Sequence, residues 1–333
     1  MEIKVCIVGC GQMGNQHAAG WVSRGDVRVV SVCDPIEERR NSLAQKTGAV
    51  AYENYQDAIL HEGVNIVSIC TPVCFHSEIA CFAAKFGRHI LCEKPLALTL
   101  EQADEMIRIA KKNNVFLSTS FQYRGLAKNI RYKEIFQQGA FGGPIFARFE
   151  DIREVRPKIA MHRCSMNGGP IIDMAGHFFD LMRWITREEP VSVFARGHIF
   201  GKGKERLLGI DDLAIDTADI IVEMSGGHVL NVLVNWGMPE GFTSLGSELL
   251  VGPNLAVRPL GSKLEIISGS EKNTCDLPPN PPGSTVRIND MVDAVREGRE
   301  PEVTGKDGRI ALAVSIAALR SIETGEVVRL SSL

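Results

Sequence analysis

Three residues of this sequence carry the side chains that the oxidation of an alcohol requires: Lys94, Asp173 and His177. Histidine, with an unperturbed pKa of about 6.5, can accept the hydroxyl proton near neutral pH. A lysine ammonium directed at the same oxygen would stabilise the developing alkoxide, and an aspartate can orient the imidazole or a neighbouring hydroxyl. The spacing of Asp173 and His177 predicts that both lie on one face of a helix. Together the three residues predict a site for hydride transfer.

Each of these residues also has a non-catalytic interpretation. Lys94 can be a solvated lysine at the end of a strand, His177 a histidine packed within a helix, and Asp173 a capping or turn carboxylate. Asp180 is better explained as a structural carboxylate of the same helix. The catalytic interpretation is favoured because the chain also carries the signature of a dinucleotide site.

That signature is a glycine-rich turn near the start of the chain, Gly9-Cys10-Gly11-Gln12-Met13-Gly14. The turn follows an apolar segment, 3–8, and precedes a predicted helix over 15–24, which is the context that a dinucleotide-binding turn requires. The first glycine permits a sharp turn, the second leaves room for the phosphates, and the third lets the helix pack against the sheet. The cofactor-binding residues predicted here are Gly9, Gly11, Gln12, Met13 and Gly14.

The choice of dinucleotide depends on Asp34, which ends a second apolar segment, 27–33. A carboxylate at this place can accept hydrogen bonds from ribose hydroxyls and would repel a 2'-phosphate, which favours NAD over NADP. Arg39, also predicted to lie near the cofactor, and Arg40 follow closely and weaken the preference. The predicted cofactor is NAD, with NADP less favoured. The alternative is a glycine turn in an unrelated α/β domain with a solvated aspartate.

The elements that would position these residues fall into two groups. Up to residue 122, β-rich segments alternate with helical periodicity, as in a parallel sheet covered by helices. From residue 123 onward, extended segments follow one another, which favours a mostly antiparallel sheet. We therefore predict an α/β protein with a dinucleotide-binding domain over 1–122 and a second domain over 123–333. The predicted strands are 3–8, 27–33, 66–71, 89–92, 115–121, 145–153, 191–200, 217–224 and 229–236, with shorter ones up to about residue 267, and the main predicted helices are 99–113, 129–138, 172–185, 286–297 and 307–323.

Composition excludes several other classes of protein. A chain of 333 residues exceeds the usual size of a single core. With 37 Lys+Arg against 40 Asp+Glu and no basic block, nucleic acid is not an expected partner. The sequence has no signal-peptide pattern and no apolar run of membrane-spanning length, so we expect a cytoplasmic protein without a membrane partner. Nine scattered cysteines predict free thiols, and no ligand spacing predicts a metal site.

These motifs resemble the Gfo/Idh/MocA oxidoreductases, the group of glucose-fructose oxidoreductase and inositol dehydrogenase. The resemblance implies an N-terminal Rossmann domain with a doubly wound parallel sheet. It also implies a C-terminal α/β domain for substrate binding and oligomerisation, whose open sheet often makes subunit contacts, and hence a homodimer or homotetramer. It is carried by the glycine turn, Cys70-Thr71-Pro72 with His76, Glu93-Lys94-Pro95, the segment 168–180 and Asp216-Thr217-Ala218.

The resemblance also implies roles for individual residues, and it marks Lys94, Asp173 and His177 as the catalytic group. The residues expected near the cofactor are Thr71, Pro72, Glu93, Lys94 and Gln122, and His76 either contacts the cofactor or is packed. For Arg124 the resemblance implies a contact with the cofactor or the substrate pocket. Independently of the resemblance, His162 and Arg163 precede the Gly168-Gly169 turn and either line the substrate pocket or form an exposed loop pair, and Trp236 is either a core aromatic or one at the rim of that pocket. Asn167 replaces the family's usual third glycine, and Met161-His162-Arg163 stands where a tryptophan is common, so the pocket need not match that of any named member.

Three functions remain open at this point. The leading hypothesis is an NAD-dependent dehydrogenase that oxidises a secondary hydroxyl of a polyol, inositol, sugar or glycoside. The second is a redox-assisted glycosidase, or an enzyme that oxidises a glycoside at its 3-position, with tightly bound NAD. The third is a non-catalytic sugar- or NAD-sensing regulator, which the presence of Lys94, Asp173 and His177 makes the least favoured.

Overall fold

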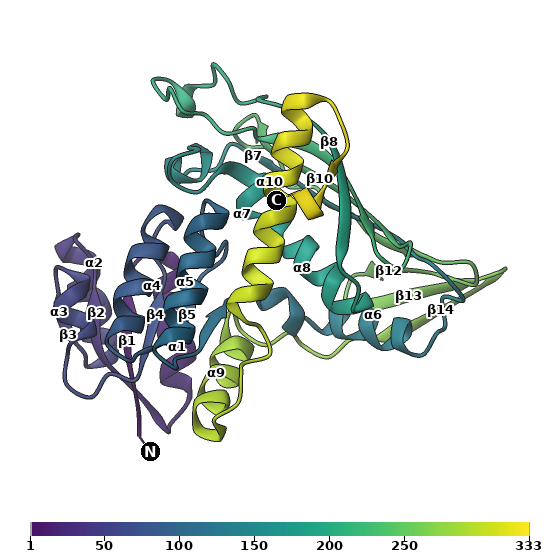
Figure 1. Ribbon diagram of the computed structural model, residues 1–333. Coiled ribbons are helices and arrows are strands. Elements are labelled where there is room, and N and C mark those ends of the chain that lie inside the picture. The colour runs from purple at the N-terminus through teal and green to yellow at the C-terminus, as the bar shows by residue number, and fades with distance from the viewer. Residues whose placement is uncertain (1, 333) are drawn as a thin grey trace. The chain divides into compact units, whose positions relative to one another are not determined.

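The structure is a computed structural model that describes residues 2–332. The chain divides into two compact units, Met1–Gln122 with Pro281–Arg309 and Tyr123–Asn280 with Ile310–Leu333 (Figure 1). One division falls where the sequence placed the domain boundary, but residues 281–309 group with the first unit. The reason is packing, because helix α9 (Thr285–Glu297) contributes three apolar side chains, Ile288, Met291 and Val292, to the core of that unit.

A six-stranded parallel sheet forms the centre of the first unit. Its strand order, β3-β2-β1-β4-β5-β6, is that of a doubly wound dinucleotide-binding fold, which confirms the predicted Rossmann architecture. The central strands β1 and β4 are buried except at Lys4 and are mostly apolar, as expected when helices cover both faces of a sheet. The strands are β1 (Ile3–Val8), β2 (Val27–Cys33), β3 (Val50–Tyr52), β4 (Ile66–Ile69), β5 (His89–Cys92) and β6 (Leu117–Thr119).

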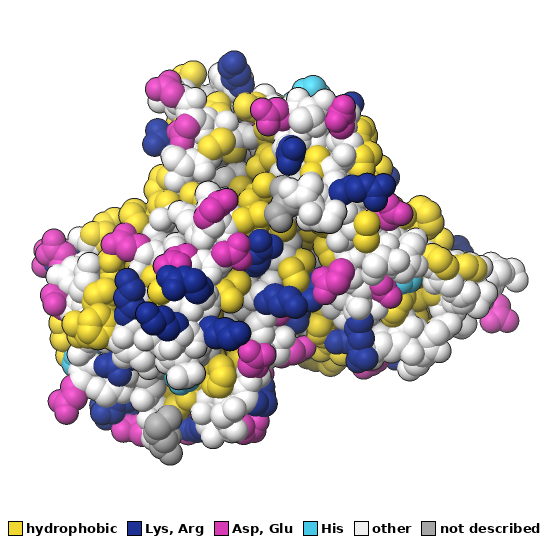
Figure 2. Space-filling view, viewed as in Figure 1, with side chains coloured by type: hydrophobic (Ala, Val, Ile, Leu, Met, Phe, Trp, Pro, Cys, Tyr) yellow, Lys and Arg dark blue, Asp and Glu magenta, His cyan; other side chains and the backbone are white. Residues whose placement is uncertain are grey.

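The helices of the first unit follow from amphipathic patterns with clear end signals. In α5 (Leu100–Lys112), Thr99 and Gln102 form a reciprocal capping box at the start. Basic residues in its last turn complement the helix dipole. Lys and Arg side chains gather over α4 and α5 on the face shown in Figure 2. The remaining helices are α1 (Gln12–Ser23), α2 (Glu37–Thr47), α3 (Tyr55–Ile59), α4 (His76–Lys85) and the short η1 (Val73–Phe75).

The second unit is built on a nine-stranded sheet in the order β14-β13-β12-β11-β7-β10-β9-β8-β15. Only the β7–β10 pair is parallel among these strands, so the predicted large, mostly antiparallel sheet is confirmed. The strands are β7 (Phe146–Glu154), β8 (Pro190–His198), β9 (Thr217–Met224), β10 (Val229–Met238), β11 (Glu248–Val251), β12 (Ala256–Leu260), β13 (Lys263–Ser268), β14 (Glu271–Asp276) and β15 (Val328–Arg329).

The two faces of this large sheet have different environments. One face is covered by helices, and the ring of Phe149 on β7 stacks on Phe178 of α8 with centroids 4.9 Å apart. The opposite face leaves Phe146, Ile221 and Val251 exposed in the single chain. The helices are α6 (Ala127–Gln137), α7 (Gly169–Asp173), α8 (Ala175–Thr186) and α10 (Gly305–Thr324), and the 3-10 turns are η2 (Gln122–Gly125), η3 (Ile159–His162), η4 (Glu205–Leu207) and η5 (Leu330–Ser332).

Two features of residues 2–332 concern membranes and metal ions. No helix there is long and apolar enough to cross a membrane. No group of three or more His, Cys, Asp or Glu side chains gathers there in a way that could hold a metal ion. All nine cysteines are free thiols.

Candidate active site

The glycine turn between β1 and α1 has the geometry that a pyrophosphate needs. Gly9 has a positive φ of 96°, and a Cβ there would lie 2.7 Å from the backbone carbonyl of Cys70. A Cβ on Gly14 would lie 1.9 Å from the carbonyl oxygen of Gly9, whereas one on Gly11 would have no neighbour within 4 Å. Gly11 is the N-cap of α1, and no side chain caps the helix there, as in helix N-termini that receive a phosphate. The turn therefore fits a dinucleotide.

Asp34 lies directly beside this turn. Its Oδ2 accepts a hydrogen bond from the backbone N–H of Cys10 at 2.9 Å, and its Oδ1 accepts one from Ile36 at 2.9 Å. These bonds fix the carboxylate at the end of β2 and leave lone pairs for ribose hydroxyls. Arg40 donates to the carbonyl oxygen of Pro35 at 3.0 Å, while the side chain of Arg39 is exposed. The arrangement agrees with the preference for NAD that the sequence predicts.

A buried ion pair holds the segment that carries Lys94. Glu93, at the end of β5, accepts a hydrogen bond from His17 Nε2 at 2.8 Å, and both side chains are buried. The Nδ1 atom of His17 lies 2.7 Å from the hydroxyl of Ser68, which also accepts a hydrogen bond from Trp21. Burial opposes charge on His17, but its contacts with Cys70 and Glu93 raise its pKa to about 10. His17 is therefore a charged anchor of Glu93.

The loops after β4 and β6 present further polar groups in the first unit. The Oγ1 of Thr71 and the Oε1 of Gln122 are buried and have no hydrogen-bond partner within residues 2–332. His76 is buried between two loops, with Nδ1 2.9 Å from the carbonyl oxygen of Pro95 and Nε2 3.0 Å from that of Thr71. Pro72 begins the turn η1. His76 thus holds the loops together, and Thr71 and Gln122 can bind a ligand.

In the second unit, Asp173 and His177 lie on two consecutive helices rather than on the single helix expected over 172–185. Asp173 is the last residue of α7 and His177 lies in the first turn of α8, with Met174 between the two helices at φ −100°. Proline and glycine residues give the segment a low intrinsic helix propensity, which explains the interruption. The backbone N–H of His177 still donates to the carbonyl oxygen of Met174 at 3.1 Å, so a hydrogen bond joins the first turn of α8 to the residue that follows Asp173.

Asn167, the departure from the family's glycine pattern, contacts the candidate catalytic carboxylate. Its Nδ2 donates a hydrogen bond to Asp173 Oδ2 at 2.9 Å. Asp173 is buried, so this bond restricts the rotation of its carboxylate. The replacement of glycine by asparagine therefore adds a hydrogen-bond donor beside Asp173.

The imidazole of His177 is held by an aromatic neighbour that sequence reasoning did not single out. The ring of Tyr123 stacks on it with centroids 4.1 Å apart and an interplanar angle of 10°. Both rings are largely buried, and burial raises the pKa of Tyr123 to about 12, so its phenol is neutral. Tyr123 therefore fixes the plane of the imidazole without adding a charge.

Removing this stacked ring should impair turnover. Tyr123→Ala is expected to lower kcat about fivefold, because aromatic stacking contributes roughly 1 kcal/mol to holding the imidazole. Tyr123→Phe keeps the ring and should retain nearly all of the activity. Steady-state kinetics of the two variants test this expectation, and equal losses in both would assign the effect to the hydroxyl instead.

Arg124 forms a buried ion pair in the second unit. Its Nε donates to Asp180 Oδ2 at 2.8 Å and its Nη2 to Asp180 Oδ1 at 2.5 Å. This paired geometry links the turn η2, which carries Tyr123, to helix α8, which carries His177. The guanidinium of Arg124, expected to line the substrate pocket, is thus bound to a protein carboxylate, and Asp180 has the structural contact expected of it.

The other residues expected in the substrate pocket have different environments. Trp236 is buried, and its Nε1 donates to Asp151 Oδ2 at 2.9 Å. His162 is also buried and lies edge-on to Trp236 with centroids 6.4 Å apart. Arg163 is partly exposed, and its Nε lies 3.3 Å from Asp212 Oδ1. His162 and Trp236 therefore come together in the structure, whereas Arg163 forms a separate loop contact.

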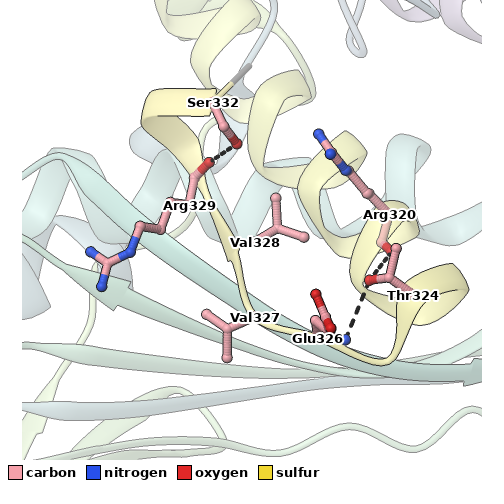
Figure 3. A pocket seen from close by; sticks show the side chains of 7 residues that line it. All are labelled: Arg320, Thr324, Glu326, Val327, Val328, Arg329 and Ser332. Atoms are coloured by element: carbon pink, nitrogen blue, oxygen red, sulfur yellow. Dashed lines mark hydrogen bonds between the residues drawn. The ribbon is translucent and has the colours of Figure 1, made fainter.

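A surface pocket at the C-terminal end of the chain is a weaker candidate. Figure 3 shows that the side chains of Arg320 and Arg329, which line it, extend in different directions and do not converge. The nearby hydroxyls bind the main chain, with Ser332 donating to the carbonyl oxygen of Arg329 at 2.6 Å and Thr324 to that of Arg320 at 2.9 Å. These groups stabilise the chain end and offer no convergent set of ligands.

Comparison with known proteins identifies the family. Residues 3–121 match the model of an oxidoreductase family with an NAD-binding Rossmann fold. Residues 130–252 match the model of the GFO/IDH/MocA C-terminal domain. The chain belongs to the Gfo/Idh/MocA family of oxidoreductases. Its first unit contains the NAD-binding domain of this family, as the glycine turn and Asp34 predicted.

Members of the Gfo/Idh/MocA family with assigned names resemble this chain over different lengths. It is 27% identical to the myo-inositol 2-dehydrogenase of Thermotoga maritima, over 99% of each chain. It is 30% identical to the D-glucoside 3-dehydrogenase of Escherichia coli, over 55% of this chain and 54% of that one. The crystal structure of myo-inositol 2-dehydrogenase from Lactobacillus plantarum has a TM-score of 0.82 at 25% identity, over 99% of each chain.

Proposed function

We propose that this oxidoreductase oxidises a secondary hydroxyl of a polyol, inositol, sugar or glycoside with NAD as the hydride acceptor. The observation that carries the proposal is the group of Asp173 and His177, held by Asn167 and Tyr123, in a chain with an NAD-binding domain. Relatives named as inositol dehydrogenases, at 25–27% identity over nearly the whole chain, support the substrate class.

Each member of the catalytic group has a distinct role in this proposal. His177 accepts the proton of the substrate hydroxyl, and Asp173 orients the imidazole or a neighbouring hydroxyl. The ammonium of Lys94 donates a hydrogen bond to the same oxygen and stabilises its developing negative charge. NAD, when bound, supplies the hydride acceptor. Glu93 and His17 fix the chain that carries Lys94.

Several residues of the first unit have a geometry that suits the binding of NAD. The turn at Gly9, Gly11 and Gly14 receives the pyrophosphate, with Gln12 and Met13 at the start of α1, and Asp34 receives the ribose. The orphaned side-chain oxygens of Thr71 and Gln122 are further candidates for contacts, because buried polar atoms without partners are costly.

A redox-assisted glycosidase, or an enzyme that oxidises a glycoside at its 3-position, is the second candidate. It is supported by the 30% identity to the D-glucoside 3-dehydrogenase over about half of the chain. The same catalytic group would oxidise a ring hydroxyl, and a glycosidase would then release the aglycone and reduce the sugar again. The two candidates differ in whether NADH accumulates.

One incubation distinguishes these candidates. Purified protein with NAD is mixed separately with inositols, free sugars, sugar acids and glycosides, and both NADH formation and aglycone release are followed. The proposal expects NADH from at least one hydroxylated substrate, whereas aglycone release without net NADH supports the glycosidase. Tight NAD binding without turnover of any compound would contradict both and indicate a sensor.

We also propose that the exposed face of the large sheet joins copies of the chain into a homodimer or homotetramer. Its support is the exposed apolar group of Phe146, Ile221 and Val251 on three strands of one sheet. Ile221→Asp should therefore convert the oligomer to monomers in light scattering. Phe86→Asp, at an exposed apolar residue of the first unit, is the matched control and should not change the mass. A monomeric wild type would refute the interface.

We propose a cytoplasmic location because the cysteines are free thiols. All nine are free, and Cys6, Cys10, Cys33 and Cys92 are buried. Free thiols persist in a reducing compartment. Fractionation of cells that express the protein tests this location, and recovery from an oxidising compartment would contradict it.

A further inference from the structure

Arg156 lies two residues after the end of β7, and its guanidinium makes no ion pair with a carboxylate of residues 2–332. Its buried Nε has no hydrogen-bond partner among the same residues. Two neighbouring arginines differ in this respect. Arg153 lies 2.6 Å from an oxygen of Asp151, and Arg206 lies 2.8 Å from one of Glu240. Arg156 is therefore the cation in this region that is left to bind something else.

The surroundings of Arg156 place it close to the proposed catalytic group of the second unit. The charge of Asp173 acts on it, and its guanidinium carbon lies 5.9 Å from the centre of the Trp236 ring. Its backbone N–H donates to His162 Nε2 at 2.9 Å, which fixes the main chain at this residue. Partial burial also lowers the pKa of Arg156, as expected for a cation separated from water.

His162 adds a second donor to this cluster. Because its Nε2 accepts a hydrogen bond and burial lowers its pKa, the ring is neutral and carries its proton on Nδ1. That Nδ1 is buried and has no acceptor within residues 2–332. Arg156 Nε and His162 Nδ1 are thus two buried N–H donors without an acceptor among residues 2–332, whereas the N–H of Trp236 donates to Asp151.

We infer that the substrate carries a carboxylate that pairs with Arg156, so that the enzyme acts on a sugar acid or a glycoside of one. A guanidinium binds a carboxylate through two parallel hydrogen bonds, and the single positive charge of Arg156 matches a single negative charge. A phosphate dianion would bring a second negative charge towards the carboxyl groups of Asp151 and Asp173, which are electrostatic neighbours of Arg156. The inference deepens the proposed function and rests on it.

The inference is tested with three substrates that differ at one position: a uronic acid, its primary amide and the parent aldose. The wild type should show a kcat/KM for the acid at least about tenfold above that for the amide. Arg156→Gln should lower kcat/KM for the acid about 100-fold and leave the amide within about threefold. The kcat/KM of Arg156→Lys for the acid should lie between those of the wild type and Arg156→Gln, because an ammonium keeps the charge without the paired hydrogen bonds. Arg28→Gln, at an exposed arginine of the first unit, is the matched control.

A second readout is calorimetric binding of the uronic acid to the protein with NADH, which needs no turnover. Binding should be measurable in the wild type and lost in Arg156→Gln. Any one of four results would overturn the inference. These are equal kcat/KM for acid and amide, an equal loss for both in Arg156→Gln, a preference for a phosphate monoester, and no binding of the acid. If the acid binds through Arg156 but no compound is oxidised, the carboxylate site is supported and the proposed reaction is contradicted.

Discussion

Replacing Lys94 by methionine should lower kcat by about 10³-fold, because the ammonium that stabilises the developing alkoxide is removed. Methionine keeps much of the length of the side chain, so the segment held by Glu93 and His17 should stay in place. Binding of NAD should change by no more than about threefold, since the glycine turn and Asp34 are untouched. NADH formation and NAD fluorescence quenching, measured on the same preparation, check both expectations.

The matched control for this variant is Lys112→Met, which makes the same substitution at an exposed lysine of α5. It should turn over as the wild type does. His177→Asn provides an independent variant at the proposed base and should also reduce turnover severely. Unchanged turnover in both Lys94→Met and His177→Asn would remove the catalytic assignment.

Replacing His17 by asparagine should destabilise the protein by about 3 kcal/mol at pH 7, because it leaves Glu93 buried without its cationic partner. The effect should depend on pH. The pKa of His17 in the folded protein is raised from 6.5 to about 10, so its stabilisation is complete below pH 6.5 and is lost as pH rises towards 10. The pKa of Glu93 is lowered, despite the opposing effect of burial, by its contact with His17. The stabilisation that Glu93 contributes is therefore lost as pH falls below the ordinary pKa of a glutamate.

Urea unfolding of the wild type and of His17→Asn at pH 6, 8 and 10 measures this effect. The two unfolding free energies should converge as pH rises, because only the wild type loses the charge on His17. His198→Asn, at an exposed histidine, is the control and should stay within about 0.5 kcal/mol of the wild type. A difference between wild type and His17→Asn that is constant over this range would show that His17 does not carry a charge in the folded protein.

The parts of the fold that the sequence predicted are those with local causes. The positive φ of Gly9 and the close approach of Gly14 to the Gly9 carbonyl require glycine at those positions, so the turn is readable from residue types alone. Helix α5 was predicted within one residue at each end because Thr99 caps it and Asn113 ends it. Strand β3 was missed because it has only three residues, which is too short for a periodic pattern.

The parts that were not predicted depend on contacts between distant residues. His17 and Glu93 are 76 positions apart, and nothing local in either segment indicates the pair. An amphipathic pattern identifies the buried face of α9 but not the core that receives it, and in the structure that core belongs to the first unit. Tyr123 lies between Gln122 and Arg124, which the sequence did single out, but its stacking on His177 requires the tertiary fold.

The central claim is that this protein moves a hydride from a hydroxyl-bearing carbon of its substrate to NAD. The most direct measurement uses a substrate from the panel that carries deuterium on that carbon, with the mass of the NADH product as the readout. The account predicts one deuterium in each NADH formed by the wild type and negligible labelled NADH with Lys94→Met. NADH without deuterium, or labelled NADH formed equally well by Lys94→Met, would contradict it.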